Sequence, residues 1–225
     1  MVSAIVLAAG LGKRLKNKLT KPLVKIDRKP AIIYSLETLN RHPKIREIIV
    51  VVGAKNKEAI SKVISKCSFK KIKSFVLGGR RRQDSVYCGL KAVSVKSDLV
   101  LIHDSARPFV DSKSISKVIQ AAKKSQAAIL GVPVKATIKQ TKKNSLVDKT
   151  LDRSNLWEIQ TPQVFKKELI FKAYQKFSKS NVTDDASLVE KLGKKVQIVL
   201  GSYKNIKITT DDDLLLGQII ARSRS

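Results

Sequence analysis

A chain of 225 residues is long enough to bury a sizeable hydrophobic core, and its hydrophobic content of 43% is ordinary for a globular protein. Two cysteines, Cys67 and Cys88, are too few for a disulfide framework or a zinc cluster, and the longest apolar runs are far shorter than a membrane span. The net charge is +28, but the basic residues are spread along the whole chain, which favours a solvated lysine-rich surface over a specific nucleic-acid site.

The N-terminus enters a predicted strand directly, at Ile5-Val6-Leu7. No basic leader or small-residue cleavage site precedes it, so we predict no secretory signal and a cytoplasmic location. The strand runs into four small residues, Ala8, Ala9, Gly10 and Gly12, which let a ligand approach the main chain closely. Backbone N–H groups there can face an anion. Lys13, Arg14 and Lys21 add positive charge, so this loop predicts a nucleoside triphosphate site.

The loop fits neither of two common phosphate-binding patterns. Arg14 stands where a Walker A motif requires Ser or Thr, and Leu15 stands where the dinucleotide fingerprint requires its third glycine. The glycines alone therefore identify no class of enzyme.

Strand and helix patterns alternate through the first half of the chain. After a short extended segment at 22–26, they predict helices at 31–41, 56–66, 83–93 and 115–124, with strands at 47–52, 72–77 and 99–102. The last of these helices is expected to be capped by Asp111 or Ser112. This alternation indicates an α/β fold with a mostly parallel sheet, in a single domain spanning residues 1–225.

The second half is less regular. It predicts strands at 127–132, 196–200 and 206–209, helices at 167–177 and 186–192, and a last helix opened by Asp211. Residues 134–141 and 146–151, joined by a turn, predict an antiparallel hairpin outside the sheet core. Residues 160–165 stand out as a motif without an assigned element.

The candidate chemistry gathers where the parallel strands end, which is where α/β sheets bind ligands. Asp104 is the best candidate for holding Mg²⁺ against phosphate oxygens, with a turn aspartate as the alternative. His103 is interpreted as structural, and residues 80–82 offer arginines for phosphate or base, or a solvated loop. With no nucleophile elbow and no HExxH motif, the sequence favours phosphoryl or nucleotidyl transfer by positioning and charge neutralisation.

Taken together, the motifs resemble the 2-C-methyl-D-erythritol 4-phosphate cytidylyltransferase family of non-mevalonate isoprenoid synthesis. The resemblance covers nearly the whole chain and rests on the segments 8–14, 78–86, 103–109, 152–153, 160–165, 183–186 and 205–209, with Lys21. It implies a Rossmann-like nucleotidyltransferase fold of three layers, a Mg²⁺-dependent reaction of CTP with 2-C-methyl-D-erythritol 4-phosphate, and a homodimer formed through a protruding β-arm at residues 133–152.

The resemblance also implies residue roles. Arg14 and Lys21 would stabilise the charge on the reacting α-phosphate. Arg153 and Lys207 would hold the methylerythritol phosphate, with Arg153 reaching the partner subunit's site, and Asp104 would take Mg²⁺. The implied CTP-binding residues are Ala8, Ala9, Gly10, Gly12, Gly79, Arg82, Ser85 and Ala106. The implied substrate-binding residues are Asp104, Arg107, Thr137, Arg153, Thr161 and Lys207.

Two positions depart from the family pattern. Arg80 follows the Gly-Gly pair where an acidic residue is common, and Pro22-Leu23 follow Lys21 where many relatives have Gln and an aromatic. Two alternatives are kept: a ribitol 5-phosphate cytidylyltransferase, which shares the 160–163 and 205–207 motifs, and a basic nucleic-acid-binding protein.

Overall fold

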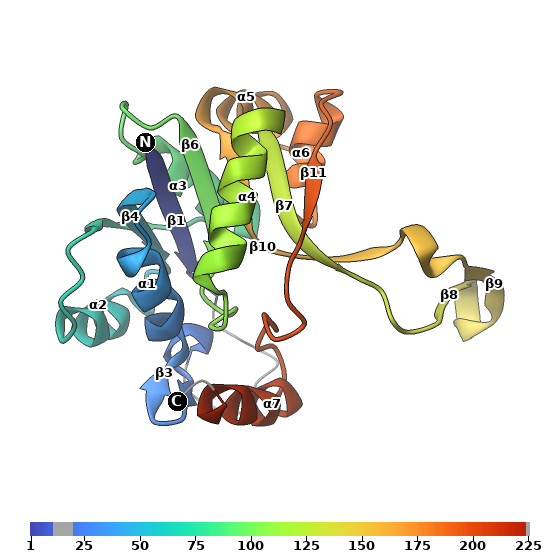
Figure 1. The fold of residues 1–225 in the computed structure, drawn as a ribbon, viewed down its shortest axis with the longest axis horizontal. Coiled ribbons are helices and arrows are strands. Elements are labelled where there is room, and N and C mark those ends of the chain that lie inside the picture. The colour runs from blue at the N-terminus through green and yellow to red at the C-terminus, as the bar shows by residue number, and fades with distance from the viewer. Residues whose placement is uncertain (11–19, 224–225) are drawn as a thin grey trace.

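The molecule is built on a seven-stranded sheet with helices on both faces and a two-stranded arm that projects from the body (Figure 1). The structure is a computed structural model that describes residues 1–10 and 20–223. The strands lie in the spatial order β11-β7-β10-β6-β1-β4-β5. Their bounds are Val2–Ala8 (β1), Ile45–Val52 (β4), Ile72–Leu77 (β5), Leu99–Asp104 (β6), Ala127–Pro133 (β7), Trp157–Lys166 (β10) and Gln197–Leu200 (β11).

The sheet is mostly parallel, as predicted. Only β10 runs against its neighbours β6 and β7, while the other adjacent pairs of this sheet are parallel. β1 lies between β4 and β6, and its side chains are buried on both faces. Ile5 faces one core and Val6 the other, both fully buried. Burying side chains of this size contributes about 1.5–3 kcal/mol each, so β1 anchors both layers.

The helices confirm the three-layer arrangement. One core cluster joins the sheet to α1, α2 and α4, and the second joins its other face to α3, α5 and α6. In α1, Ile32, Leu36 and Leu39 recur at helical spacing and are fully buried. The helix bounds are Ala31–Arg41 (α1), Lys57–Ser65 (α2), Arg82–Lys91 (α3), Ser112–Ser125 (α4), Lys167–Phe177 (α5), Ala186–Lys191 (α6) and Asp211–Arg222 (α7).

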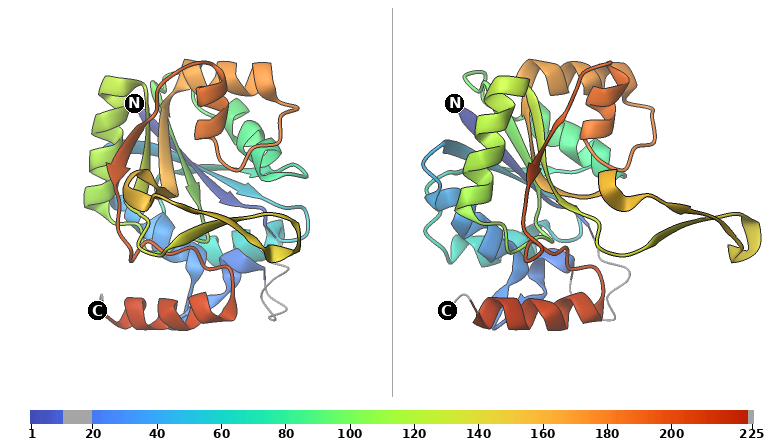
Figure 2. Two further views of the ribbon diagram at one scale, coloured as in Figure 1. Left: turned by 90° about the vertical axis from the view of Figure 1, so that its right-hand side faces the viewer. Right: turned by 45° about the vertical axis from the view of Figure 1, so that its right-hand side comes forward.

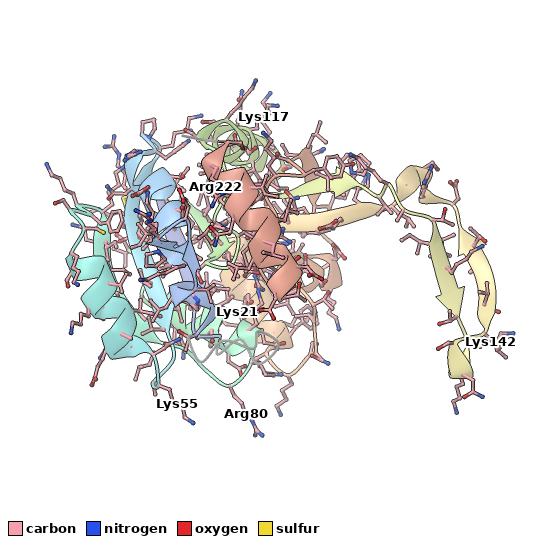
Figure 3. The ribbon with its side chains drawn as sticks, turned by 90° about the horizontal axis from the view of Figure 1, so that it is seen from below. Lys21, Lys55, Arg80, Lys117, Lys142 and Arg222 are labelled. Carbon is pink, nitrogen blue, oxygen red and sulfur yellow. The ribbon has the colours of Figure 1, made fainter. Side chains whose placement is uncertain are left out.

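A small third cluster lies beyond the carboxyl ends of the strands. There, α7 packs with the two-residue strands β2 (Lys25–Ile26) and β3 (Lys29–Pro30) around buried Phe109 and Ile208. Thr210 caps α7 by accepting a hydrogen bond from the backbone N–H of Asp213. Figure 3 looks onto this side of the molecule, where Lys21 and Arg222 are labelled.

The arm consists of β8 (Ile138–Thr141) and β9 (Val147–Leu151), followed by a short helical turn, η3 (Arg153–Asn155). It extends away from the body in Figure 1 and in the right-hand view of Figure 2. Lys142 lies near its far end (Figure 3). The predicted hairpin is therefore confirmed, although its first strand is shorter than expected. Leu146 and Val147 at the turn are 68% and 60% exposed, so the arm carries apolar surface that the described part of the chain leaves open to solvent.

The structure differs from the sequence interpretation at three segments. Residues 22–26, predicted to be extended, begin in a short helical turn, η1 (Lys21–Leu23), and only Lys25–Ile26 forms a strand. Residues 206–209 form no strand, because Ile208 pairs with Ala106 through a single backbone hydrogen bond of 2.8 Å and its side chain enters the third cluster. Conversely, the motif at 160–165, which had no assigned element, lies within the ten-residue strand β10. Asp111, one of the two expected caps, does cap α4 through the N–H of Ser114.

Across residues 1–10 and 20–223, no helix combines the length and the apolar character that crossing a membrane requires.

Candidate active site

The loops after β1 and β4 are fastened together by one buried side chain, Asn56. Its Nδ2 donates to the carbonyl oxygen of Ala8 over 3.0 Å, and its Oδ1 accepts from the N–H of Gly53 over 2.8 Å. Ala8 is buried, Ala9 is half-buried and Gly10 is exposed. The predicted small-residue loop therefore leaves the sheet from a fixed position.

The turn after β5 is shaped by close packing against the start of α3. A side chain on Gly78 would meet Ser85 Oγ at 2.6 Å, and one on Gly79 would meet the side chain of Asp84 at 2.4 Å, so both positions need glycine. Ser85 Oγ accepts a hydrogen bond from the N–H of Gly79 over 3.2 Å. Ser85 thus holds the glycine turn beside the β1 loop.

Three charged side chains converge at the end of β6. The carboxylate of Asp104 accepts from Lys207 Nζ over 2.6 Å and from Arg82 Nε over 3.1 Å. Arg82 begins α3, and Lys207 lies in the loop before α7. Burial disfavours the carboxylate, but the charges of Arg82 and Lys207 outweigh it and hold the pKa of Asp104 well below its usual range. Asp104 is therefore ionised throughout the physiological pH range.

Two cavities meet at this Arg82–Asp104–Lys207 cluster. The first, of about 270 Å³, is lined by residues from the β1 loop, the glycine turn and the β6 end. Its lining includes Ala9, Gly10, Lys21, Gly79, Ser85 and Ala106. Cations outnumber the one carboxylate in this lining, so the cavity favours an anion. Arg80 also borders it, but is exposed and its side chain points outward (Figure 3).

The second cavity, of about 420 Å³, lies toward β7, β10 and β11. It shares Arg82, Asp104 and Lys207 with the first, and adds Arg107 and Thr161. The structure thus brings most of the residues predicted to bind CTP to one cavity and four of those predicted to bind the second substrate to the other.

His103 has a structural place beneath the cluster, as the sequence suggested. Thr161 Oγ1 accepts from the N–H of Asp104 and donates to His103 Nδ1, and His103 Nε2 donates to the carbonyl oxygen of Arg107. With Nε2 donating, Nδ1 accepts from Thr161 when the imidazole is neutral, so these bonds are satisfied by the neutral form. Burial, only partly offset by Asp104, lowers the pKa of His103 to about 4.

This neutral histidine predicts a pH dependence of stability. The unfolded chain takes up a proton near pH 6.5, whereas folded His103 resists protonation until about pH 4. The free energy of unfolding should therefore fall by about 3 kcal/mol as the pH drops from 6.5 to 4, and change little from this source above 6.5. His42, whose pKa burial and Lys44 also lower, adds to the same slope. Denaturant unfolding across this range measures it.

The control for this prediction is His103→Asn, which removes the titrating group. A slope below pH 6.5 that is equally steep in the variant and the wild type would contradict the assignment.

Several predicted residues are not placed at these cavities. Arg14 and Gly12 lie outside the described residues. Thr137 and Arg153 are exposed on the arm and line neither cavity.

Arg107 donates to the carbonyl oxygens of Asn205 and Ile159 over 2.8 and 3.1 Å, which secures the loop carrying Lys207. Its Nε is buried without a hydrogen-bond partner in this structure.

Sequence reasoning gave no role to the residues that hold Arg82. Asp185 pairs with both terminal nitrogens of its guanidinium, and Tyr174 and Gln163 in turn hold Asp185. The motifs containing Asp185 and Gln163 stood out in the sequence. Nothing in their spacing indicates that Asp185 binds Arg82 or that Gln163 binds Asp185.

For Mg²⁺, the donor set offers one carboxylate. The part of the chain that the structure describes contains no group of three or more His, Cys, Asp or Glu that could hold a metal ion by itself. One carboxylate completed by substrate phosphates and water is nevertheless a common Mg²⁺ environment. Asp104 therefore fits a metal ion that arrives bound to a triphosphate. For the metal to bind, Arg82 or Lys207 has to release one carboxylate oxygen of Asp104.

A three-layer α/β fold with a cationic, glycine-lined cavity at the ends of its parallel strands defines the class of nucleotidyltransferases. The chain matches the family model described as 2-C-methyl-D-erythritol 4-phosphate cytidylyltransferase over residues 2–223. The chain belongs to this family, and it is an enzyme.

Individual relatives agree over nearly the full length. Proteins of that name from Shouchella clausii and Alkaliphilus oremlandii are each 44% identical, over 99% of this chain and 97% and 95% of theirs. The crystal structure of 4-diphosphocytidyl-2C-methyl-D-erythritol synthase from Anaerococcus prevotii superposes with a TM-score of 0.87 at 36% identity, covering 98% of this chain and 96% of the other. These matches agree with the resemblance drawn from the motifs.

Proposed function

We propose that this enzyme transfers the cytidylyl group of CTP to 2-C-methyl-D-erythritol 4-phosphate at the Arg82–Asp104–Lys207 cluster. The observation that carries this assignment is the meeting of two cavities at that cluster, and we assign one cavity to each substrate. A transferring group has to pass between its donor and its acceptor, and both cavities open onto Asp104 and Lys207.

The reaction forms a bond between an acceptor phosphate oxygen and the α-phosphorus of CTP, and breaks the bond from that phosphorus to the bridging oxygen of pyrophosphate. The acceptor is a phosphate monoester with a second pKa of about 6, so it is already a nucleophilic dianion at neutral pH. It needs no general base. It needs the repulsion between two polyanions to be cancelled and the attack to be in line.

On the CTP side, the first cavity supplies backbone groups and cations. Ala9 and Gly79 line this cavity and would approach cytosine closely, with Ser85 holding the glycine turn in place. Ala8, also predicted to bind CTP, is buried and lines neither cavity. Lys21 would neutralise charge that develops on the α-phosphate, together with Arg14, which lies outside the described residues. Mg²⁺ would be held by Asp104 and would neutralise further phosphate charge.

On the acceptor side, Lys207 would meet the attacking phosphate, because it borders both cavities. Thr161 and Arg107 line the second cavity and would contact the sugar alcohol. Thr137 and Arg153 belong to the arm segment and line neither cavity of their own subunit.

These arm residues would act in the site of a second copy, which makes the enzyme a homodimer. A two-stranded hairpin is marginally stable in water by itself, so an arm of this kind needs a partner surface. The exposed side chains of Leu146 and Val147 supply apolar area for it. The cytoplasmic location remains a prediction from the sequence.

The test is pyrophosphate release from CTP with each candidate acceptor. We expect rapid release with 2-C-methyl-D-erythritol 4-phosphate and Mg²⁺, and little with ribitol 5-phosphate, with no acceptor, or with a chelator in place of the metal. A preference for ribitol 5-phosphate would overturn the assignment of the acceptor. Undiminished release in the chelator would overturn the assignment of Mg²⁺.

A further inference from the structure

A second buried carboxylate lies behind the Arg82–Asp104–Lys207 cluster. Asp185, fully buried at the start of α6, accepts Arg82 Nη1 on Oδ1 over 3.1 Å and Arg82 Nη2 on Oδ2 over 3.0 Å. Two parallel bonds of this kind fix both the position and the plane of a guanidinium. The remaining donor, Nε, then reaches a single oxygen of Asp104.

Asp185 is itself held rigidly. Tyr174 of α5 donates its hydroxyl to Asp185 Oδ1 over 2.5 Å, and Gln163 of β10 accepts from the backbone N–H of Asp185 over 3.2 Å. Burial and the Asp185 charge raise the pKa of Tyr174, so the phenol remains a donor. Residues of α5 and β10 therefore hold the one carboxylate that binds both terminal nitrogens of Arg82.

The geometry of Arg82 has a consequence for Asp104. Free to turn, an arginine beside a carboxylate forms a two-bond pair that occupies both oxygens. Here both terminal nitrogens are taken by Asp185, so Arg82 reaches only Oδ1 of Asp104. Oδ2 is left for Lys207, which it binds over 2.6 Å.

We propose that Asp185 is a positioning residue for cytidylyl transfer: by holding both terminal nitrogens of Arg82, it keeps one oxygen of Asp104 for Lys207 at the point where the two cavities meet. Without Asp185, Arg82 turns toward Asp104, and Lys207 loses its anchor. This inference rests on the proposed function, because it assigns the cluster to the reacting phosphates.

The experiment compares Asp185→Asn with Glu168→Gln, in the wild-type background and in Arg82→Gln. Glu168 is the control carboxylate, because it lies on α5, the helix that carries Tyr174, is exposed, pairs with Lys166, and lines neither cavity. Removing a partner that orients a site residue typically lowers activity about 10- to 100-fold, so we expect that loss in kcat for Asp185→Asn. The KM for CTP should change less than about 3-fold, because substrate contacts remain.

The double variant distinguishes positioning from a general structural role. If Asp185 acts through Arg82, Asp185→Asn causes no further loss of kcat once Arg82 is Gln, because the group it holds is gone. An equal loss in both backgrounds, or an equal loss in Glu168→Gln, would overturn the proposal, as would unchanged kcat in Asp185→Asn.

A milder variant covers the case in which Asp185→Asn fails to fold. Tyr174→Phe keeps the ring, which stacks on Tyr87, and removes only the hydroxyl that holds Asp185. We expect a smaller loss of kcat that also vanishes in Arg82→Gln; a loss that persists there would overturn the proposal.

Wild-type pyrophosphate release is measured first. An inactive wild type would refute the proposed function, whereas an active wild type with an unaffected Asp185→Asn would refute only this inference.

Discussion

Replacing Lys207 by alanine is expected to lower kcat about 10²- to 10³-fold, the usual cost of losing one preorganised charge contact with a transition state. Lys207 is 2.6 Å from Asp104 and borders both cavities, so its ammonium lies where the attacking phosphate meets CTP. Steady-state pyrophosphate release at saturating CTP measures the effect.

Lys204→Ala is the matched control for this experiment. Lys204 lies in the same loop three residues earlier, is exposed, and carries the same charge. Its removal should leave kcat within about 2-fold of the wild type, as expected for an exposed charge remote from the chemistry. If the two variants lose activity equally, the effect of Lys207 is one of general charge, and its role at the reacting phosphate is refuted.

Arg153→Ala and Lys207→Ala, each nearly inactive alone, are expected to restore activity when combined in one heterodimer. If Arg153 acts in the partner's site, one site of the mixed dimer contains both variants and the other contains neither. A purified heterodimer should then show about half of the wild-type kcat per dimer, because a two-fold dimer has two equivalent sites. Co-expression with two affinity tags isolates the mixed species.

Lys207→Ala combined with Asp104→Asn is the control for this mixing experiment. Both residues belong to the body of one subunit, so every site in that heterodimer carries a defect. It should remain inactive. An inactive Arg153/Lys207 heterodimer would show that Arg153 acts within its own subunit, or that no shared site forms.

The sequence predicted the ends of the parallel strands well, because continuous apolar runs and the small or charged residues after them are local signals. Strand β10 could not be predicted in the same way. Its middle carries Pro162 between polar residues, which argues against a central strand. For the segment 206–209 the sequence predicted a strand that does not form. Its alternation resembles a strand, but Ile208 packs in the third cluster and Lys207 binds Asp104.

The contact between Arg82 and Asp185 cannot be predicted from local sequence patterns. The two residues are 103 positions apart, and each stands beside other charged residues that look equally suitable as partners. Only the packing of α3 against α5 and α6 selects this pair. The same holds for Thr161, whose hydroxyl orders His103 and Asp104 because β10 lies next to β6.

The arm leaves the body from two strands that are already paired, with Trp157 of β10 opposite Pro133 of β7. This pairing holds the two ends of the arm together at its base. Lengthening a loop whose ends are already held together costs little free energy. Residues 138–151 can thus change in length and composition without disturbing β6 or Asp104. Recognition between two copies can therefore diverge within residues 138–151, while Thr137 and Arg153, which flank that segment, keep the contribution that the arm would make to the partner's site.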